Sequence, residues 1–117
     1  MSDLFCPARV VVTPSSSAVA LADALVAERV AAVLAADREQ SHDAARELAA
    51  RLGTSYGRLP EGTLRVALEA VADLHRGETV VVVTDTDLAQ LPGRPGAPVL
   101  VEIDADGWRT QPVSRPG

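Results

Sequence analysis

A run of four valines, residues 80–83, dominates the hydrophobic pattern of the chain. A β-branched run without a polar face predicts a strand that is buried on both sides, which is typical of a central parallel strand between layers of helices. Small polar residues (Thr-Asp-Thr-Asp, 84–87) follow it directly. Ligands bind beyond the carboxyl ends of the strands in open α/β sheets, so this strand end is the candidate functional region.

The other apolar segments alternate between strand-like and helix-like spacing. Short apolar runs predict strands at 9–13, 30–34, 54–59 and 99–103, and an antiparallel edge strand at 108–113 follows a predicted Asp-Gly hairpin turn at 104–107. Apolar residues three or four positions apart predict helices at 18–29 and 39–52. They also predict a third helix that ends at Gly77 and has on one face Leu64, Leu68, Val71 and Leu74.

Local signals define several helix ends. Ser17 is the expected N-cap of the first helix, and the spacing of Asp37 and Gln40 suits a capping interaction at the start of the second. Gly53 is the expected C-terminal stop of that second helix. A short helical turn is expected at 88–91.

This order of elements predicts an α/β fold: a three-layer α/β sandwich with a mostly parallel sheet and an antiparallel C-terminal hairpin. The whole chain, 1–117, is expected to form one domain, with residues 1–7 and 114–117 loose.

Composition narrows the class of protein. Hydrophobic residues make up 47% of the 117 positions, which excludes a disordered chain, and the net charge of −5 argues against a nucleic-acid partner. No apolar run approaches the length of a membrane span, and the first residues lack the pattern of a signal peptide. The single cysteine, Cys6, fits a reducing compartment, so a cytoplasmic location is expected.

Three segments resemble the histidine phosphatase superfamily, which has the phosphoglycerate mutase-like fold. Residues 30–36 followed by 44–53 are similar to that family's second strand and the helix after it, and residues 68–84 to its penultimate helix and the strand that bears its second catalytic histidine. Residues 99–113 resemble its closing β-hairpin. The resemblance spans about the whole chain, but this chain is shortened and lacks most of the insertion that covers the family's active site.

The resemblance implies a phosphoryl-transfer site, and most of that site is missing from this sequence. Where the family has Arg-His-Gly, the chain has Thr13-Pro14-Ser15, so Pro14, or Ser15 in a register shifted by one, replaces the nucleophilic histidine. Gln40 replaces an arginine of the second helix, Ala36 a serine before it, and Asp85 the second histidine. Only Glu61 matches, at the position of the family's general acid.

The replacement of a histidine by Asp85 puts a negative charge where the family binds a phosphate dianion. Two unit charges about 4 Å apart repel by roughly 4 kcal/mol at an effective dielectric near 20. Neither of the family's two arginines is present to offset this term, so phosphatase or mutase activity is not expected.

Several candidate residues have a structural and a functional interpretation. Asp85 and Asp87 fit an acid/base pair, or a divalent metal site with Asp37 or Glu61, but capping of the helical turn near Leu88 by Asp85, with Asp87 in solvent, is the favoured interpretation.

The triplet 15–17 fits either ligand binding or capping, with capping favoured. His42 is expected at the surface, His75 at a helix C-terminus, and the lone Trp108 in core packing.

Three functions remain open. The first is a catalytically inactive, histidine-phosphatase-like domain that binds a partner or forms a homodimer, in a regulatory or structural role. The second is an enzyme with different acid/base chemistry in a pocket at the ends of the first and fourth strands, which requires burial to raise the pKa of Asp85. The third is a generic Rossmann-like module that binds a nucleotide or a small metabolite, against which the absence of a glycine-rich phosphate motif counts.

The first function is preferred. The candidate ligand-binding residues are Thr13, Ser15, Asp37, Gln40 and Asp85, and the candidate catalytic residues of the second function are Asp85 and Glu61 with hydrogen bonding from Thr13. No cofactor, metal, nucleic-acid or membrane partner is expected. The chain is expected to form a homo-oligomer or to bind a protein partner, and a small-molecule ligand is possible.

Overall fold

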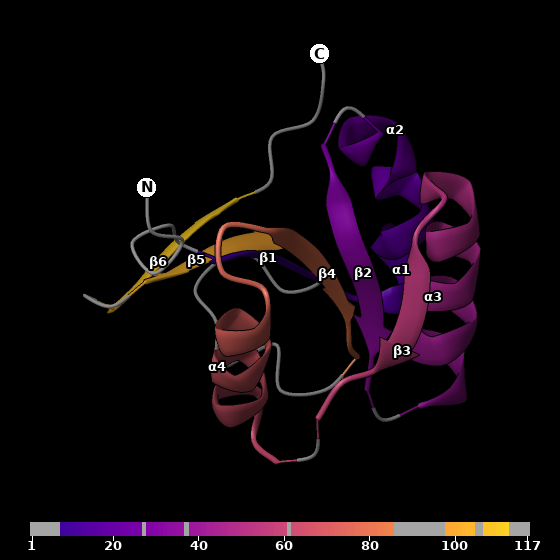
Figure 1. The fold of residues 1–117 in the computed structure, drawn as a ribbon. Coiled ribbons are helices and arrows are strands. Elements are labelled where there is room, and N and C mark those ends of the chain that lie inside the picture. The colour runs from indigo at the N-terminus through magenta and orange to yellow at the C-terminus, as the bar shows by residue number, and fades with distance from the viewer. Residues whose placement is uncertain are drawn as a thin grey trace.

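The computed structural model describes residues 8–26, 28–36, 38–60, 62–85, 98–104 and 107–112, and for 111 and 112 the backbone alone. A six-stranded sheet runs through these residues in the order β3-β2-β4-β1-β5-β6. Helices lie on both of its faces (Figure 1). The expected three-layer α/β architecture is therefore confirmed.

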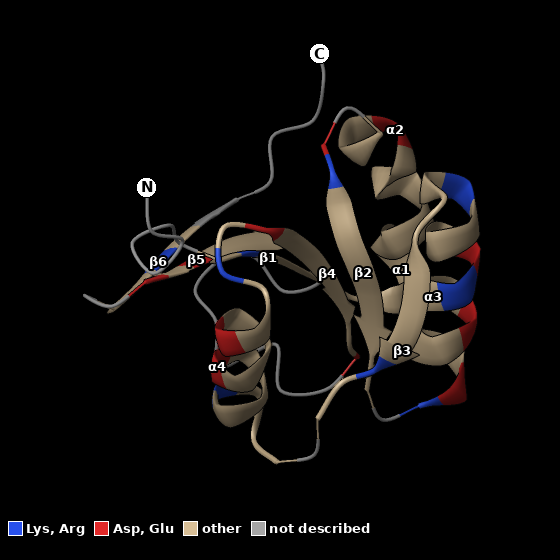
Figure 2. Cartoon of the chain, viewed as in Figure 1, with Lys and Arg blue, Asp and Glu red and all other residues tan. Residues whose placement is uncertain are grey.

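The valine run forms β4 (Thr79–Val83) and lies inside the sheet, as expected. It pairs in parallel with β1 (Ala8–Thr13) on one side and with β2 (Val30–Ala35) on the other. All of its residues are buried, and Figure 2 shows no charged residue along it.

Successive side chains of β4 point to opposite faces, and each face has its own core. Val80 and Val82 belong to a cluster with Leu68 and other residues of α4 (Leu64–Leu74). Val81 and Val83 belong to a second cluster with Leu48 of α3 (Glu39–Leu52). The strand lacks a polar face because helices cover both of its faces.

The other predicted strands are also present. β3 (Ser55–Arg58) pairs in parallel with β2 at one edge of the sheet. β5 (Val99–Asp104) runs antiparallel to β1, and β6 (Gly107–Pro112) runs antiparallel to β5 at the other edge. The C-terminal hairpin is therefore confirmed, and Trp108 packs against the core cluster on the α4 side.

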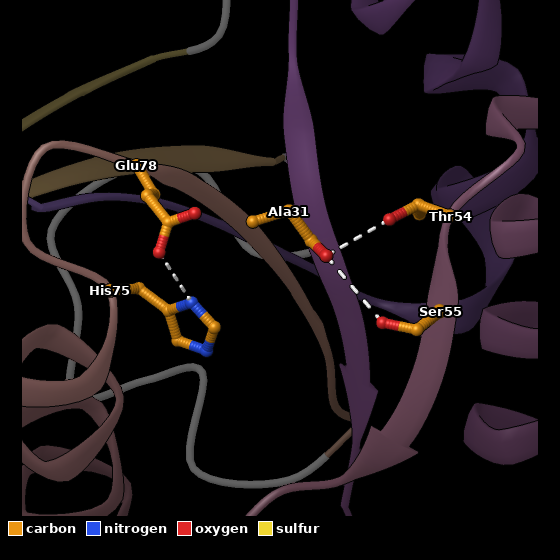
Figure 3. A network of polar contacts seen from close by, with 5 residues as sticks. All are labelled: Ala31, Thr54, Ser55, His75 and Glu78. Atoms are coloured by element: carbon orange, nitrogen blue, oxygen red, sulfur yellow. Dashed lines mark hydrogen bonds and ion pairs between the residues drawn. The ribbon is translucent and has the colours of Figure 1, made fainter.

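Side chains also tie elements together (Figure 3). The hydroxyls of Thr54 and Ser55 donate to the backbone carbonyl of Ala31, 3.0 and 3.5 Å away, which holds the start of β3 against β2. In the turn between α4 and β4, His75 Nδ1 lies 3.1 Å from Glu78 Oε1. His75 occupies the C-cap position of α4, as expected.

The first predicted helix begins and ends earlier than expected. Helical turns start at Ser15 and continue through α1 (Ser15–Ala18), the 3₁₀ turn η2 (Val19–Leu21) and α2 (Ala22–Leu25). Ser17 is therefore inside the first turn, where its N–H donates to the carbonyl of Pro14, and its assignment as N-cap is wrong. Pro14 takes the N-cap position in an extended conformation, which suits a residue without an N–H.

The second predicted helix, α3, has the expected bounds. Gly53 follows it with φ +68, the left-handed conformation that favours glycine at a helix end. Arg38 occupies its N-cap position without a side-chain capping bond, and Asp37 lies outside the described residues.

The inner face of α4 is rotated slightly from the expected one. Leu64, Leu68 and Val71 are buried as predicted, but Leu74 is 74% exposed. Because each residue turns the helix by about 100°, the buried arc is centred on Leu68 and Val71 and includes Ala67 and Ala72, while Leu74 falls at its edge.

Other expectations fall outside the described residues: the chain ends with Cys6, the helical turn at 88–91, and the candidate residues Glu61 and Asp87. Among the helices that the structure does describe, none is long and apolar enough to cross a membrane.

Two leucines of α4 test this packing. Leu68→Ala removes a fully buried side chain and should lower the free energy of unfolding by about 2–5 kcal/mol. Leu74→Ala in the same helix should change it by less than about 0.5 kcal/mol. Urea unfolding of both variants measures the difference, and equal losses would show that Leu74 is buried after all.

Candidate functional site

Buried polar side chains gather at the carboxyl ends of the central strands. Thr13 ends β1, Thr84 follows β4, and Ser41 lies in the first turn of α3, and all three are almost fully inaccessible. The backbone joins the two strand ends, because the Thr84 N–H donates to the Thr13 carbonyl over 3.0 Å. This polar layer surrounds the next residue of the chain, Asp85.

Both carboxylate oxygens of Asp85 accept hydrogen bonds. Oδ1 accepts from the backbone N–H and from the hydroxyl of Ser15, each at 3.0 Å. Oδ2 accepts a short hydrogen bond from the hydroxyl of Ser41. Asp85 therefore links the end of β4 to the first turns of α1 and α3.

These contacts lower the pKa of Asp85 below the ordinary aspartate value of 3.8. Partial burial is the largest single influence and raises the pKa, but the hydrogen bonds from Ser41, Ser15 and Gln40 together outweigh it. The enzyme hypothesis required a raised pKa at this residue, and that expectation is wrong. A carboxylate with a lowered pKa and both oxygens occupied is a weak general base.

Asp85 accepts at the start of a helix that is distant in the sequence. The sequence suggested that Asp85 caps a turn near Leu88, a segment outside the described residues. In the structure Asp85 accepts from Ser15 at the start of α1, seventy positions away in the chain. Tertiary contact supplies the acceptor that a local N-cap side chain would provide.

The structure brings together four of the predicted ligand-binding residues and gives them structural partners. Ser15 and Gln40 hydrogen-bond to Asp85. Thr13 is fully buried, and its hydroxyl donates to the Pro14 carbonyl over 3.0 Å. Asp37 and Glu61 lie outside the described residues, so their roles stay predictions.

Sequence reasoning missed Ser41. It lies four residues before Ala45 and seven before Leu48, on the buried face of α3. A buried hydroxyl on an otherwise apolar helix face needs a hydrogen-bond partner, so the spacing of Ser41 from Ala45 and Leu48 could have indicated a polar contact there.

A separate cleft of about 800 Å³ opens beyond the carboxyl ends of β2 and β3. Its polar lining comes from α3, from β3 and from the end of β4: Glu39, His42, Arg46, Tyr56, Arg58 and Thr84. Apolar side chains also line it, from the end of β2 to the start of α4: Ala35, Ala36, Leu59, Pro60 and Leu64. The enzyme hypothesis placed its pocket at β1 and β4, whereas this cleft is displaced toward the β3 edge.

His42, which was expected at the surface, is partly buried and lines this cleft. Its Nδ1 hydrogen-bonds to the hydroxyl of Tyr56, and the two rings meet edge to face at 83°. On the next turn of α3, the Arg46 guanidinium lies over the Tyr56 ring, 5.2 Å from its centroid. The four-residue spacing of His42 and Arg46 indicates that both lie on one face of the helix. Their contact with Tyr56 also requires β3 to pair with β2, which the sequence does not show.

The described residues contain no group of three or more His, Cys, Asp or Glu side chains arranged to hold a metal ion. The metal hypothesis involved Asp37, Glu61 and Asp87, which are not among them.

Comparison with solved structures identifies the fold. The crystal structure of phosphoglycerate mutase from Plasmodium falciparum superimposes with a TM-score of 0.64, at 12% sequence identity, and covers 92% of this chain and 91% of that one. No protein-family model matches the sequence, and the search of curated proteins gives no match. The chain therefore has a phosphoglycerate mutase-like fold, as the resemblance implied.

Replacement of the carboxylate tests the Asp85 contacts. Asp85→Asn keeps the shape but turns charge-assisted hydrogen bonds into neutral ones, so the free energy of unfolding at pH 7 should fall by about 1 kcal/mol. Because the pKa is lower in the folded than in the unfolded chain, the charge stabilises the fold above the unfolded value of 3.8. That contribution is lost as the pH falls through the folded-state pKa.

Urea unfolding of wild type and Asp85→Asn between pH 2.5 and 7 measures this effect, and the difference should shrink at the acid end. Asp73→Asn is the matched control, because the Asp73 side chain is 71% exposed and its ion pair with Arg76 should be worth less than about 0.5 kcal/mol. A difference between wild type and Asp85→Asn that is independent of pH would contradict the assignment.

Proposed function

We propose that this phosphoglycerate mutase-like domain is catalytically inactive as a phosphatase or mutase and acts by binding, in a regulatory or structural role. The observation that supports the proposal most is the state of Asp85 at the end of the central strand. Its carboxylate is ionised at neutral pH and engaged by Ser15 and Ser41.

An ionised carboxylate disfavours a phosphate dianion at the same place. At about 4 Å the repulsion is roughly 4 kcal/mol for each unit charge of the phosphate with an effective dielectric near 20, and more than one nearby cation is needed to reverse it. The chain supplies Pro14, Ser15 and Gln40 where the resemblance implies the nucleophilic histidine, its neighbour and an arginine. In the structure Pro14 takes the N-cap position of α1, and Ser15 and Gln40 hydrogen-bond to Asp85.

The first test is a turnover assay. Incubation of the purified chain with a generic phosphomonoester such as para-nitrophenyl phosphate should give no release above the rate without protein. Reproducible, metal-independent hydrolysis that is abolished by Glu61→Gln would contradict the proposal, since Glu61 matches the family's general acid in the sequence. Asp73→Asn serves as the control for nonspecific effects of losing an acidic group.

The proposed binding role includes self-association or a protein partner, in the cytoplasm. The sheet order leaves β3 and β6 at its two edges, and unpaired strand edges are common sites of strand addition. Sedimentation equilibrium of the purified chain should give a mass of two or more chains for the homo-oligomeric form of this role. A monomer at all concentrations would leave a different protein as the partner.

A further inference from the structure

We propose that the cleft beyond β2 and β3 is a binding site for a small organic monocarboxylate, with the carboxylate on Arg58 and an apolar body along the side chains of Leu59 and Leu64. This inference adds a ligand class to the proposed binding role. It concerns residues other than Asp85 and its partners, so it does not depend on the absence of turnover.

The size of the cleft fits a small metabolite. Its volume of about 800 Å³ is within the range of ligand sites in proteins, and its lining is more polar than apolar. Leu59 and Leu64 are themselves more than nine-tenths buried, so the surfaces that they present to the cleft are backed by the α4-side core. An apolar ligand body would cover these surfaces.

One arginine of the cleft can supply the donors for a carboxylate. Arg58 ends β3, and no ion pair or hydrogen bond joins its side chain to another described residue. Its planar guanidinium presents parallel donors that match a carboxylate.

The other charged groups described around the cleft sum to one negative charge. Arg46 pairs with Asp43 over 3.1 Å, and the remaining charged residue of the lining, Glu39, is negative. Because these described groups together with Arg58 carry no net charge, the hydrogen-bond donors of Arg58 rather than an overall positive charge would hold the ligand, and a phosphate dianion is disfavoured more strongly than a monoanion.

One wall of the cleft is already fixed in place. The Tyr56 ring contacts the Arg46 guanidinium and the His42 ring, and its hydroxyl is hydrogen-bonded to His42. A wall that does not have to be ordered on binding lowers the entropic cost of association. Arg58 follows Tyr56 by two residues on the same strand, so it projects from the same face of β3 beside this wall.

A titration with three matched compounds tests the proposal. Benzoate has the carboxylate and an apolar ring, benzamide lacks the charge, and phenyl phosphate carries a dianion at neutral pH. Amide ¹H–¹⁵N spectra of the intact chain should show saturable shifts with benzoate at Gly57 and Gly62, which line the cleft. Benzamide and phenyl phosphate should each bind at least about tenfold more weakly.

Variants locate the carboxylate. Arg58→Gln should weaken benzoate binding by about tenfold or more, as expected for the loss of a charge-assisted hydrogen bond, and Arg58→Lys should weaken it less. Arg51→Gln is the matched control, because Arg51 lies at the other end of α3, pairs with Glu47, and does not line the cleft. The affinity of the Arg51→Gln variant for benzoate should equal that of wild type. The same spectra show whether each variant is folded.

Three outcomes would overturn the proposal. They are no saturable shift with benzoate, equal or tighter binding of benzamide or phenyl phosphate, and equal weakening by Arg58→Gln and Arg51→Gln. None of them bears on phosphomonoester turnover, so this inference and the proposed lack of catalysis fail separately.

Discussion

The double burial of β4 is the constraint on which the rest of the fold depends. Val80 and Val82 need an apolar cover on one face, and Val81 and Val83 need one on the other. The chain supplies α4 for the first face and α1 to α3 for the second, and the parallel partners β1 and β2 satisfy the strand's backbone. Because these layers meet along one strand, Ser15 after β1, Asp85 after β4 and the start of α3 are brought to the same edge of the sheet.

At that edge the hydrogen-bond donors of the chain engage its own carboxylate, Asp85. Asp85 is held by donors from two helix starts, and the positive ends of helix dipoles favour a negative charge there. The same features that suit a bound phosphate in a helix-flanked site, namely N–H and hydroxyl donors, are taken up by a side chain of the protein itself. The strand end therefore has a clear structural role, and the accessible cavity lies beside it, over β2 and β3.

The sequence predicted those features that depend on local pattern. The bounds of α3 follow from its apolar spacing and from Gly53, and the central place of β4 follows from its four consecutive valines. The start of α1 was misplaced because its acceptor, Asp85, is distant in the chain, and a local cap such as Ser17 was the only candidate that sequence reasoning offers. The contact of His42 with Tyr56 joins a helix to an edge strand, and only the pairing of β3 with β2 brings them together.

The most direct measurement for the central claim is the ionisation of Asp85 itself. In a ¹³C-labelled sample, the chemical shift of its carboxyl carbon can be followed from pH 7 to pH 2. The account predicts a midpoint below the ordinary aspartate value of 3.8, because the donors from Ser15 and Ser41 stabilise the charged form. A midpoint at or above that value would contradict it, because Asp85 would then be a carboxyl group whose burial, rather than its hydrogen bonds, determines its chemistry.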